Sequence, residues 1–74
     1  MHFPFEFNLE DRVHVVVNKT GANEYEFDLK DKEGPLSHFT YLDDGRPKAD
    51  VEAPLDFDQL NALRRFWLEM EESA

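Results

Sequence analysis

Apolar residues alternate with polar ones through the first half of the chain, and nearly all of them stand at odd-numbered positions. In an extended strand, successive side chains point to opposite faces, so residues of one parity share a face. The alternation predicts a sheet that is polar on one face and apolar on the other. The predicted apolar face contains Phe3, Phe5, Phe7, Leu9, Val13, Val15, Val17, Tyr25, Phe27, Leu29, Phe39 and Tyr41.

The segments between the predicted strands are short and contain turn-forming residues. We expect strands over about 3–9, 12–18, 24–30 and 36–42, with Gly and Asp residues in the connections. Short connections join antiparallel neighbours, because parallel neighbours need long crossovers. The sequence thus predicts a four-stranded antiparallel meander in the order 1-2-3-4. Residues 46–53 lack a clear period, and we expect a short edge strand or an extended return loop there.

A C-terminal amphipathic helix is the most clearly punctuated element. Asp56 suits the N-cap and Gln59 follows three residues later, which is the spacing of a capping box. Apolar residues then recur at helical spacing over about 57–72, namely Leu60, Leu63, Phe66, Trp67 and Met70. At this spacing Trp67 and Met70 are expected to serve the core rather than a ligand site. We therefore predict an α+β fold in which the helix packs across the apolar face of the sheet.

The 74 residues are enough for a single domain. Within 1–74 we expect the sheet over about 3–42, a return loop over about 43–55 and the helix over about 57–72. The chain has no Cys, so neither a disulfide nor a thiolate metal site reinforces it. A core of this size gives marginal stability, for which self-association is a common remedy.

The chain is strongly acidic, with 17 Asp and Glu against eight Lys and Arg and a formal charge of −9. This balance argues against direct binding of nucleic acid and against an anionic membrane surface, because both require a basic face. The simplest interpretation is solubility. A sharper alternative is an acidic decoy that occupies a basic, nucleic-acid-binding surface, although the carboxylates are spread along the chain rather than clustered.

Pairing odd residues with odd residues across each turn defines a register for the sheet. The simplest one pairs Leu9 with Val13, Val17 with Tyr25, and Leu29 with Ser37. It gives the core rows Phe7–Val15–Phe27–Phe39 and Phe5–Val17–Tyr25–Tyr41. On the polar face it gives the row Asn8–His14–Asp28–His38.

The only residues in this pattern that suggest chemistry are His14, Asp28 and His38. A carboxylate flanked by two imidazoles can hold a divalent metal or tune a proton-transfer pair. However, polar rows of alternating charge are normal on a one-sided sheet, and no pocket wall is evident. We expect a solvated face here, with a metal or proton-transfer site as the alternative, and we expect no cofactor.

Apolar residues at the sheet edge and on the polar face suggest an interface. By parity Val16, Leu36 and Leu42 lie on the polar face, and the first strand, with Phe3 and Phe5, is expected at an edge that can accept another strand. We therefore expect a non-catalytic protein–protein interaction module that binds a protein partner or its own copies. The first residues lack the basic and long apolar segments of a signal peptide, so a cytoplasmic protein is expected.

Overall fold

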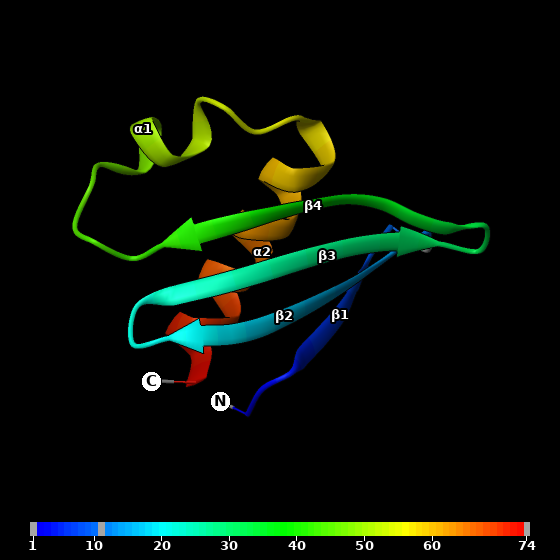
Figure 1. The fold of residues 1–74 in the computed structure, drawn as a ribbon, viewed down its shortest axis with the longest axis horizontal. Helices are drawn as coiled ribbons and strands as arrows, with labels where there is room; N and C mark the ends of the chain where they lie inside the picture. The colour runs from blue at the N-terminus through cyan, green and yellow to red at the C-terminus, as the bar shows by residue number, and fades with distance from the viewer. Residues whose placement is uncertain (1, 11, 74) are drawn as a thin grey trace.

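The computed structural model describes residues 2–10 and 12–73 and contains a four-stranded sheet with two helices (Figure 1). The strands lie side by side in the order β1-β2-β3-β4, and every neighbouring pair is antiparallel. The elements are β1 (Phe5–Leu9), β2 (Val13–Gly21), β3 (Glu24–Asp31), β4 (Gly34–Leu42), α1 (Lys48–Glu52) and α2 (Phe57–Ser73). The predicted meander and C-terminal helix are confirmed.

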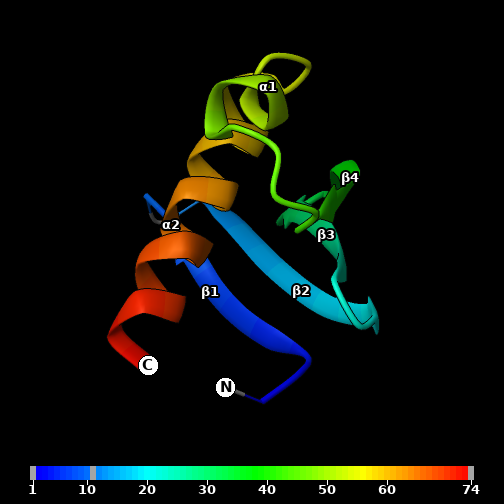
Figure 2. The same cartoon turned by 90° about the vertical axis from the view of Figure 1, so that its left-hand side faces the viewer.

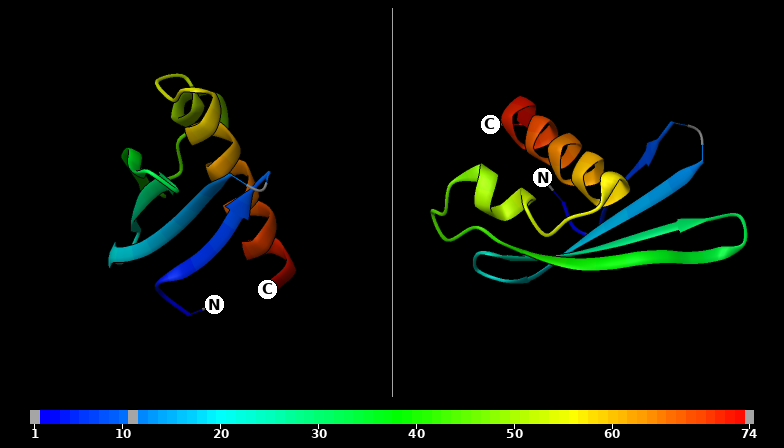
Figure 3. Two further views of the ribbon diagram at one scale, coloured as in Figure 1. Left: turned by 90° about the vertical axis from the view of Figure 1, so that its right-hand side faces the viewer. Right: turned by 90° about the horizontal axis from the view of Figure 1, so that it is seen from above.

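Both helices lie on the same side of the sheet, so the molecule has two layers and one sheet face that the helices leave uncovered (Figures 2 and 3). The core lies between the layers. The strands contribute the buried side chains of Val15, Val17, Tyr25, Phe27, Leu29 and Tyr41, and α2 contributes those of Ala62, Leu63 and Phe66. The buried sheet residues are all odd-numbered, as the alternation predicted.

Phe66 is the centre of the core. Its ring lies 5.2 Å from that of Phe27 in an edge-to-face arrangement and 5.3 Å from that of Tyr25. The rings of Phe3 and Phe5 lie 6.4 and 6.3 Å from it. These separations fall within the favourable range for aromatic pairs. Phe66 therefore connects the rings of Phe3 and Phe5 at the start of the chain with those of Tyr25 and Phe27 on β3.

The register confirms the predicted pairing at two of the three strand interfaces. Leu9 lies opposite Val13 and Leu29 opposite Ser37. Between β2 and β3 the prediction is wrong by two residues, because Val17 lies opposite Phe27 rather than Tyr25. β2 continues further into the turn than expected, to Gly21, while β3 begins at Glu24 as expected, and a bulge lies between Lys19 and Gly21. A shift of two keeps every side chain on its predicted face.

The return segment contains a helix, so the prediction of an edge strand or extended loop over 46–53 is wrong. Gly45 has φ +86°, a conformation that favours glycine, and it turns the chain away from the end of β4. Pro47 then stands at the N-cap of α1, where its fixed φ suits a helix start. The Glu52 carboxylate accepts a 2.7 Å hydrogen bond from Arg64 Nε, which ties α1 to α2.

The start of α2 has the predicted capping box. The backbone N–H of Gln59 donates to Asp56 Oδ1 at 2.9 Å, and the backbone N–H of Asp56 donates to Gln59 Oε1 at 3.1 Å. The Gln59 amide also donates to Ser37 Oγ at 3.0 Å, which fixes the start of the helix against β4. Three polar groups are therefore satisfied at one point, and the entry of α2 onto the sheet is well defined.

We expect Asp56→Ala to lower the free energy of unfolding by about 1 kcal/mol, because the helix loses its N-cap acceptor. For a domain of this size that corresponds to a fall in Tm of roughly 4–8 °C in thermal unfolding followed by circular dichroism. Asp56→Asn is the matched control, since its amide oxygen can still accept the bond from Gln59. Equal losses in the two variants would contradict the role of the side-chain oxygen.

Candidate functional site

The structure does not bring His14, Asp28 and His38 into the predicted row. Asp28 lies opposite His38, as expected. However, His14 lies opposite Lys30, and the position beside Asp28 that was predicted for His14 is occupied by Val16. The cause is the two-residue shift between β2 and β3 described above. The predicted row is therefore wrong between His14 and Asp28, whereas the neighbours Asn8–His14 and Asp28–His38 are as expected.

His14 and His38 are each paired instead with a glutamate on the uncovered face. The His14 ring lies 2.7 Å from Glu6 Oε1 through Nε2 and 2.9 Å from Asn8 Oδ1 through Nδ1. His38 Nε2 lies 3.0 Å from Glu26 Oε1. Over residues 2–10 and 12–73, no three His, Cys, Asp or Glu side chains are grouped so that they could hold a metal ion. These pairs are exposed and cross-strand, an arrangement that contributes little to stability.

The predicted interface residues divide into two groups. Phe3 and Phe5 are half-buried and their rings face Phe66, so they offer little side-chain surface to a partner. Leu36 and Leu42 are 47% and 43% exposed, near the two ends of β4, and Val16 is half-buried on the uncovered face. Among the predicted interface residues, the exposed apolar side chains thus lie on β4 rather than near β1, while α2 exposes Phe57 and Leu68.

The backbone of β4 is available for pairing along its outer edge. The Asp43 N–H donates to the Asn23 carbonyl at 2.8 Å, which makes these two residues a hydrogen-bonded pair. Such pairs alternate along an antiparallel ladder, so Phe39 bonds to β3, while the N–H and C=O groups of His38 and Thr40 point away from it. Among the described residues, β4 pairs with β3 alone, and no turn, loop or cap hydrogen bond uses these outward groups.

The two sheet edges differ in length and in protection. β4 has nine residues and no Asp, Glu, Lys or Arg. The features that disfavour pairing lie near its start, where Pro35 is followed by a bulge that leaves Leu36 without an opposite residue on β3. β1 has five residues, includes Glu6 and is preceded by Pro4. Both helices lie toward the covered face, and no described segment continues the sheet beyond β4 (Figures 2 and 3). β4 is therefore the more open edge, a difference that strand parity alone could not reveal.

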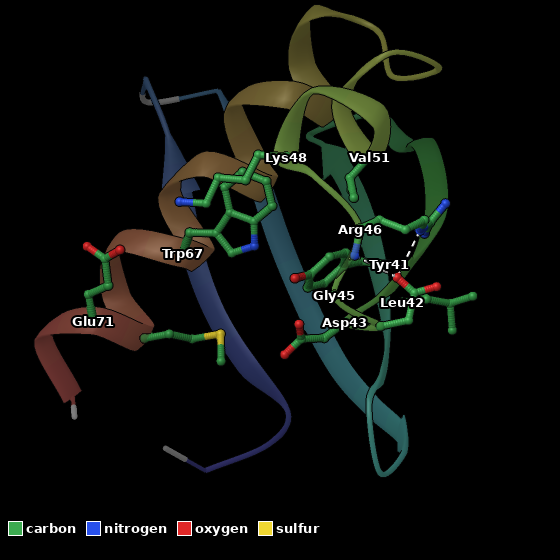
Figure 4. A pocket seen from close by; sticks show the side chains of 11 residues that line it. Tyr41, Leu42, Asp43, Gly45, Arg46, Lys48, Val51, Trp67 and Glu71 are labelled. Atoms are coloured by element: carbon green, nitrogen blue, oxygen red, sulfur yellow. Dashed lines mark hydrogen bonds and ion pairs between the residues drawn. The ribbon is translucent and has the colours of Figure 1, made fainter.

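A cleft of about 290 Å³ lies on the covered side, where the end of β4, α1 and the last turns of α2 meet (Figure 4). Its aromatic wall consists of Tyr41 and Trp67, whose rings lie 5.9 Å apart in an edge-to-face arrangement. Val51 and Met70 add apolar surface. The sequence pattern assigned Trp67 to the core, yet the indole is only half-buried and also lines this cleft.

The charged groups of the cleft are arranged around this wall. Lys48 Nζ lies 4.9 Å from the centre of the Trp67 ring, in cation–π contact. The Asp44 carboxylate accepts a 2.9 Å hydrogen bond from Arg46 Nε. Burial raises the pKa of Tyr41, the nearby Asp43 carboxylate acts in the same direction, and a hydrogen bond from Trp67 opposes them. The Tyr41 hydroxyl therefore stays protonated at neutral pH and remains a hydrogen-bond donor.

Comparisons with known proteins give no further guide to function. No family model matches this chain, and neither the curated proteins nor the solved structures include a match. Among the helices of the described residues, none is long and apolar enough to cross a membrane.

Proposed function

We propose that this protein is a non-catalytic interaction module that forms a homodimer by pairing the β4 strands of two copies. The observation that carries this proposal is the edge of β4, which has nine residues, no Asp, Glu, Lys or Arg, and outward backbone groups with no backbone partner among the described residues. Natural proteins protect sheet edges with lysine, proline or covering segments, because an open edge accepts a strand from another chain. An open edge of this length is therefore a feature of a pairing surface.

The edge is complementary to itself. An antiparallel pairing with its two-fold axis at Phe39 places His38 of one copy opposite Thr40 of the other, and these are the residues whose backbone groups point outward. The same register brings Leu36 of one copy to Leu42 of the other. The exposed leucines at the ends of β4 would then cover each other, and two four-stranded sheets would form one continuous sheet.

Size and charge act on this association in opposite directions. A domain of 74 residues buries only about 60% of the surface that its unfolded chain exposes, so it gains stability by extending its sheet. A charge of −9 on each copy opposes association by repulsion, and salt screens that repulsion. The dimer is therefore expected to be stronger at higher ionic strength, unlike an association that depends on ion pairs between copies.

Sedimentation equilibrium over a range of protein and NaCl concentrations tests the proposal. We expect the mass to rise from that of one chain, 8.7 kDa, to twice that value, and the transition to move to lower protein concentration as NaCl increases. A mass of 8.7 kDa at every concentration up to about 1 mM, where binding corresponds to roughly −4 kcal/mol, would contradict the proposal. The acidic-decoy hypothesis and the cytoplasmic location stay predictions.

A further inference from the structure

The Trp67 ring carries a cation that comes from the same chain. Lys48, at the start of α1, places its ammonium group 4.9 Å from the ring centre, so this face of the indole attracts positive charge. The indole also separates two depressions of the surface, and Lys48, Trp67 and Glu71 line both of them. The Trp67 indole, which we call the platform, is thus accessible from more than one side.

Carboxylates flank this platform. In Figure 4 the Glu71 and Asp43 side chains lie on either side of the Trp67 indole. The third acidic residue, Asp44, is paired with Arg46, so these two charges largely compensate each other. Of the remaining charges that line the cleft, Asp43 and Glu71 are negative and Lys48 is positive. The cleft therefore attracts a cation even while Lys48 occupies the ring.

Lys48 is held weakly. It belongs to a helix of five residues, none of which is buried, and its own side chain is exposed. Besides the contact of Lys48 with Trp67, the described contacts of α1 with the rest of the molecule include the Glu52–Arg64 pair and the half-buried side chain of Val51. A cation with a stronger affinity for the indole can displace the ammonium group without disturbing the core.

We propose that this cleft binds the side chain of an arginine presented by a partner protein, which takes the place of the Lys48 ammonium on Trp67. A guanidinium group is planar and weakly hydrated, so it stacks on an aromatic ring while it donates two hydrogen bonds to one carboxylate. Glu71 and Asp43 line the same cleft as Trp67 and supply such carboxylates. The volume of about 290 Å³ suits one side chain, since sites for larger ligands begin near 300 Å³.

The single tryptophan makes the test specific, because the chain contains no other indole. We expect N-acetyl-argininamide to change the Trp67 fluorescence with a saturating dependence on concentration at fixed ionic strength. The amide of N-acetyl-citrulline has nearly the same shape without the charge, and we expect no saturating change with it. Equal curves for the two compounds would overturn the proposal.

Three variants separate this site from general attraction to an acidic protein. Lys48→Ala frees the ring, and we expect it to tighten binding of N-acetyl-argininamide about two- to fivefold, the equivalent of one cation–π contact. Glu71→Gln should weaken binding severalfold. Glu33→Gln is the matched control, because it removes the same charge in the β3–β4 turn, at the far end of β4 from the cleft (Figure 1).

Equal weakening by Glu71→Gln and Glu33→Gln would overturn the proposal, because it would show that only net charge matters. If Lys48→Ala bound N-acetyl-argininamide as the unmodified protein does, or more weakly, the proposal that arginine displaces the Lys48 ammonium group would be wrong. The same titration of Thr40→Pro, which is designed to prevent pairing of β4, keeps this test independent of the dimer. We expect that variant to bind N-acetyl-argininamide as the unmodified protein does.

Discussion

Replacing Phe66 with Ala is expected to remove a large part of the stability of this protein. The ring is fully buried and contacts four other rings, those of Phe3, Phe5, Tyr25 and Phe27. Truncation of a buried Phe to Ala costs about 3–5 kcal/mol, because apolar burial is lost and a cavity remains. A domain of this length has a total stability of roughly 4–11 kcal/mol. In urea unfolding followed by circular dichroism, the midpoint urea concentration of the variant should lie far below that of the unmodified protein or near zero.

Phe57→Ala is the matched control, because it removes the same ring from the same helix at a position that is 73% exposed. We expect it to change the free energy of unfolding by about 0.5 kcal/mol or less. If Phe66→Ala cost as little as Phe57→Ala, the aromatic cluster would not be the core of the folded protein in solution.

Replacing Thr40 with Pro is expected to weaken the proposed dimer by a factor on the order of 10–100. Proline removes the outward N–H of residue 40 in both copies, and each lost hydrogen bond is worth about 0.5–1.5 kcal/mol. Residue 40 does not donate to β3, so the variant should keep the fold, as proline does at an edge. Sedimentation equilibrium should show one chain at concentrations where the unmodified protein is a dimer.

Thr40→Val is the control for this substitution, since it keeps the N–H group and the β-branched shape. We expect its association to equal that of the unmodified protein or to exceed it slightly. A dimer that survives Thr40→Pro with a native circular dichroism spectrum would show that the copies associate through another surface, and the pairing of β4 would be wrong.

The layers of the fold follow from the sequence because side-chain parity survives small errors. Val17 meets Phe27 instead of Tyr25, yet it is still buried, since a shift of two residues preserves the face of each side chain. The polar face does not share this tolerance, because a site depends on particular neighbours. The same shift separated His14 from Asp28 and placed Lys30 opposite His14.

The cleft could not be predicted from the sequence, for a different reason. It depends on α1, and five residues carry too little periodicity to distinguish a helix from a loop. Trp67 follows the apolar spacing of α2, which gave no sign that one face of its indole would meet Lys48. The open edge of β4 could be predicted in part, because parity had placed Leu36 and Leu42 on the outer face. The sequence pattern did not show which of the two sheet edges would remain open.

For the proposed dimer, the unequal lengths of the two edges also bear on where assembly stops. If β1 were as long and uncharged as β4, each copy could pair one edge with the next copy, and the sheets would grow into a fibre. β1 has only five residues, with Glu6 within it and Pro4 just before it, which are features that discourage strand addition. On the proposed pairing of β4, we therefore expect association to end at two copies, because the short and guarded first strand discourages open-ended polymerisation.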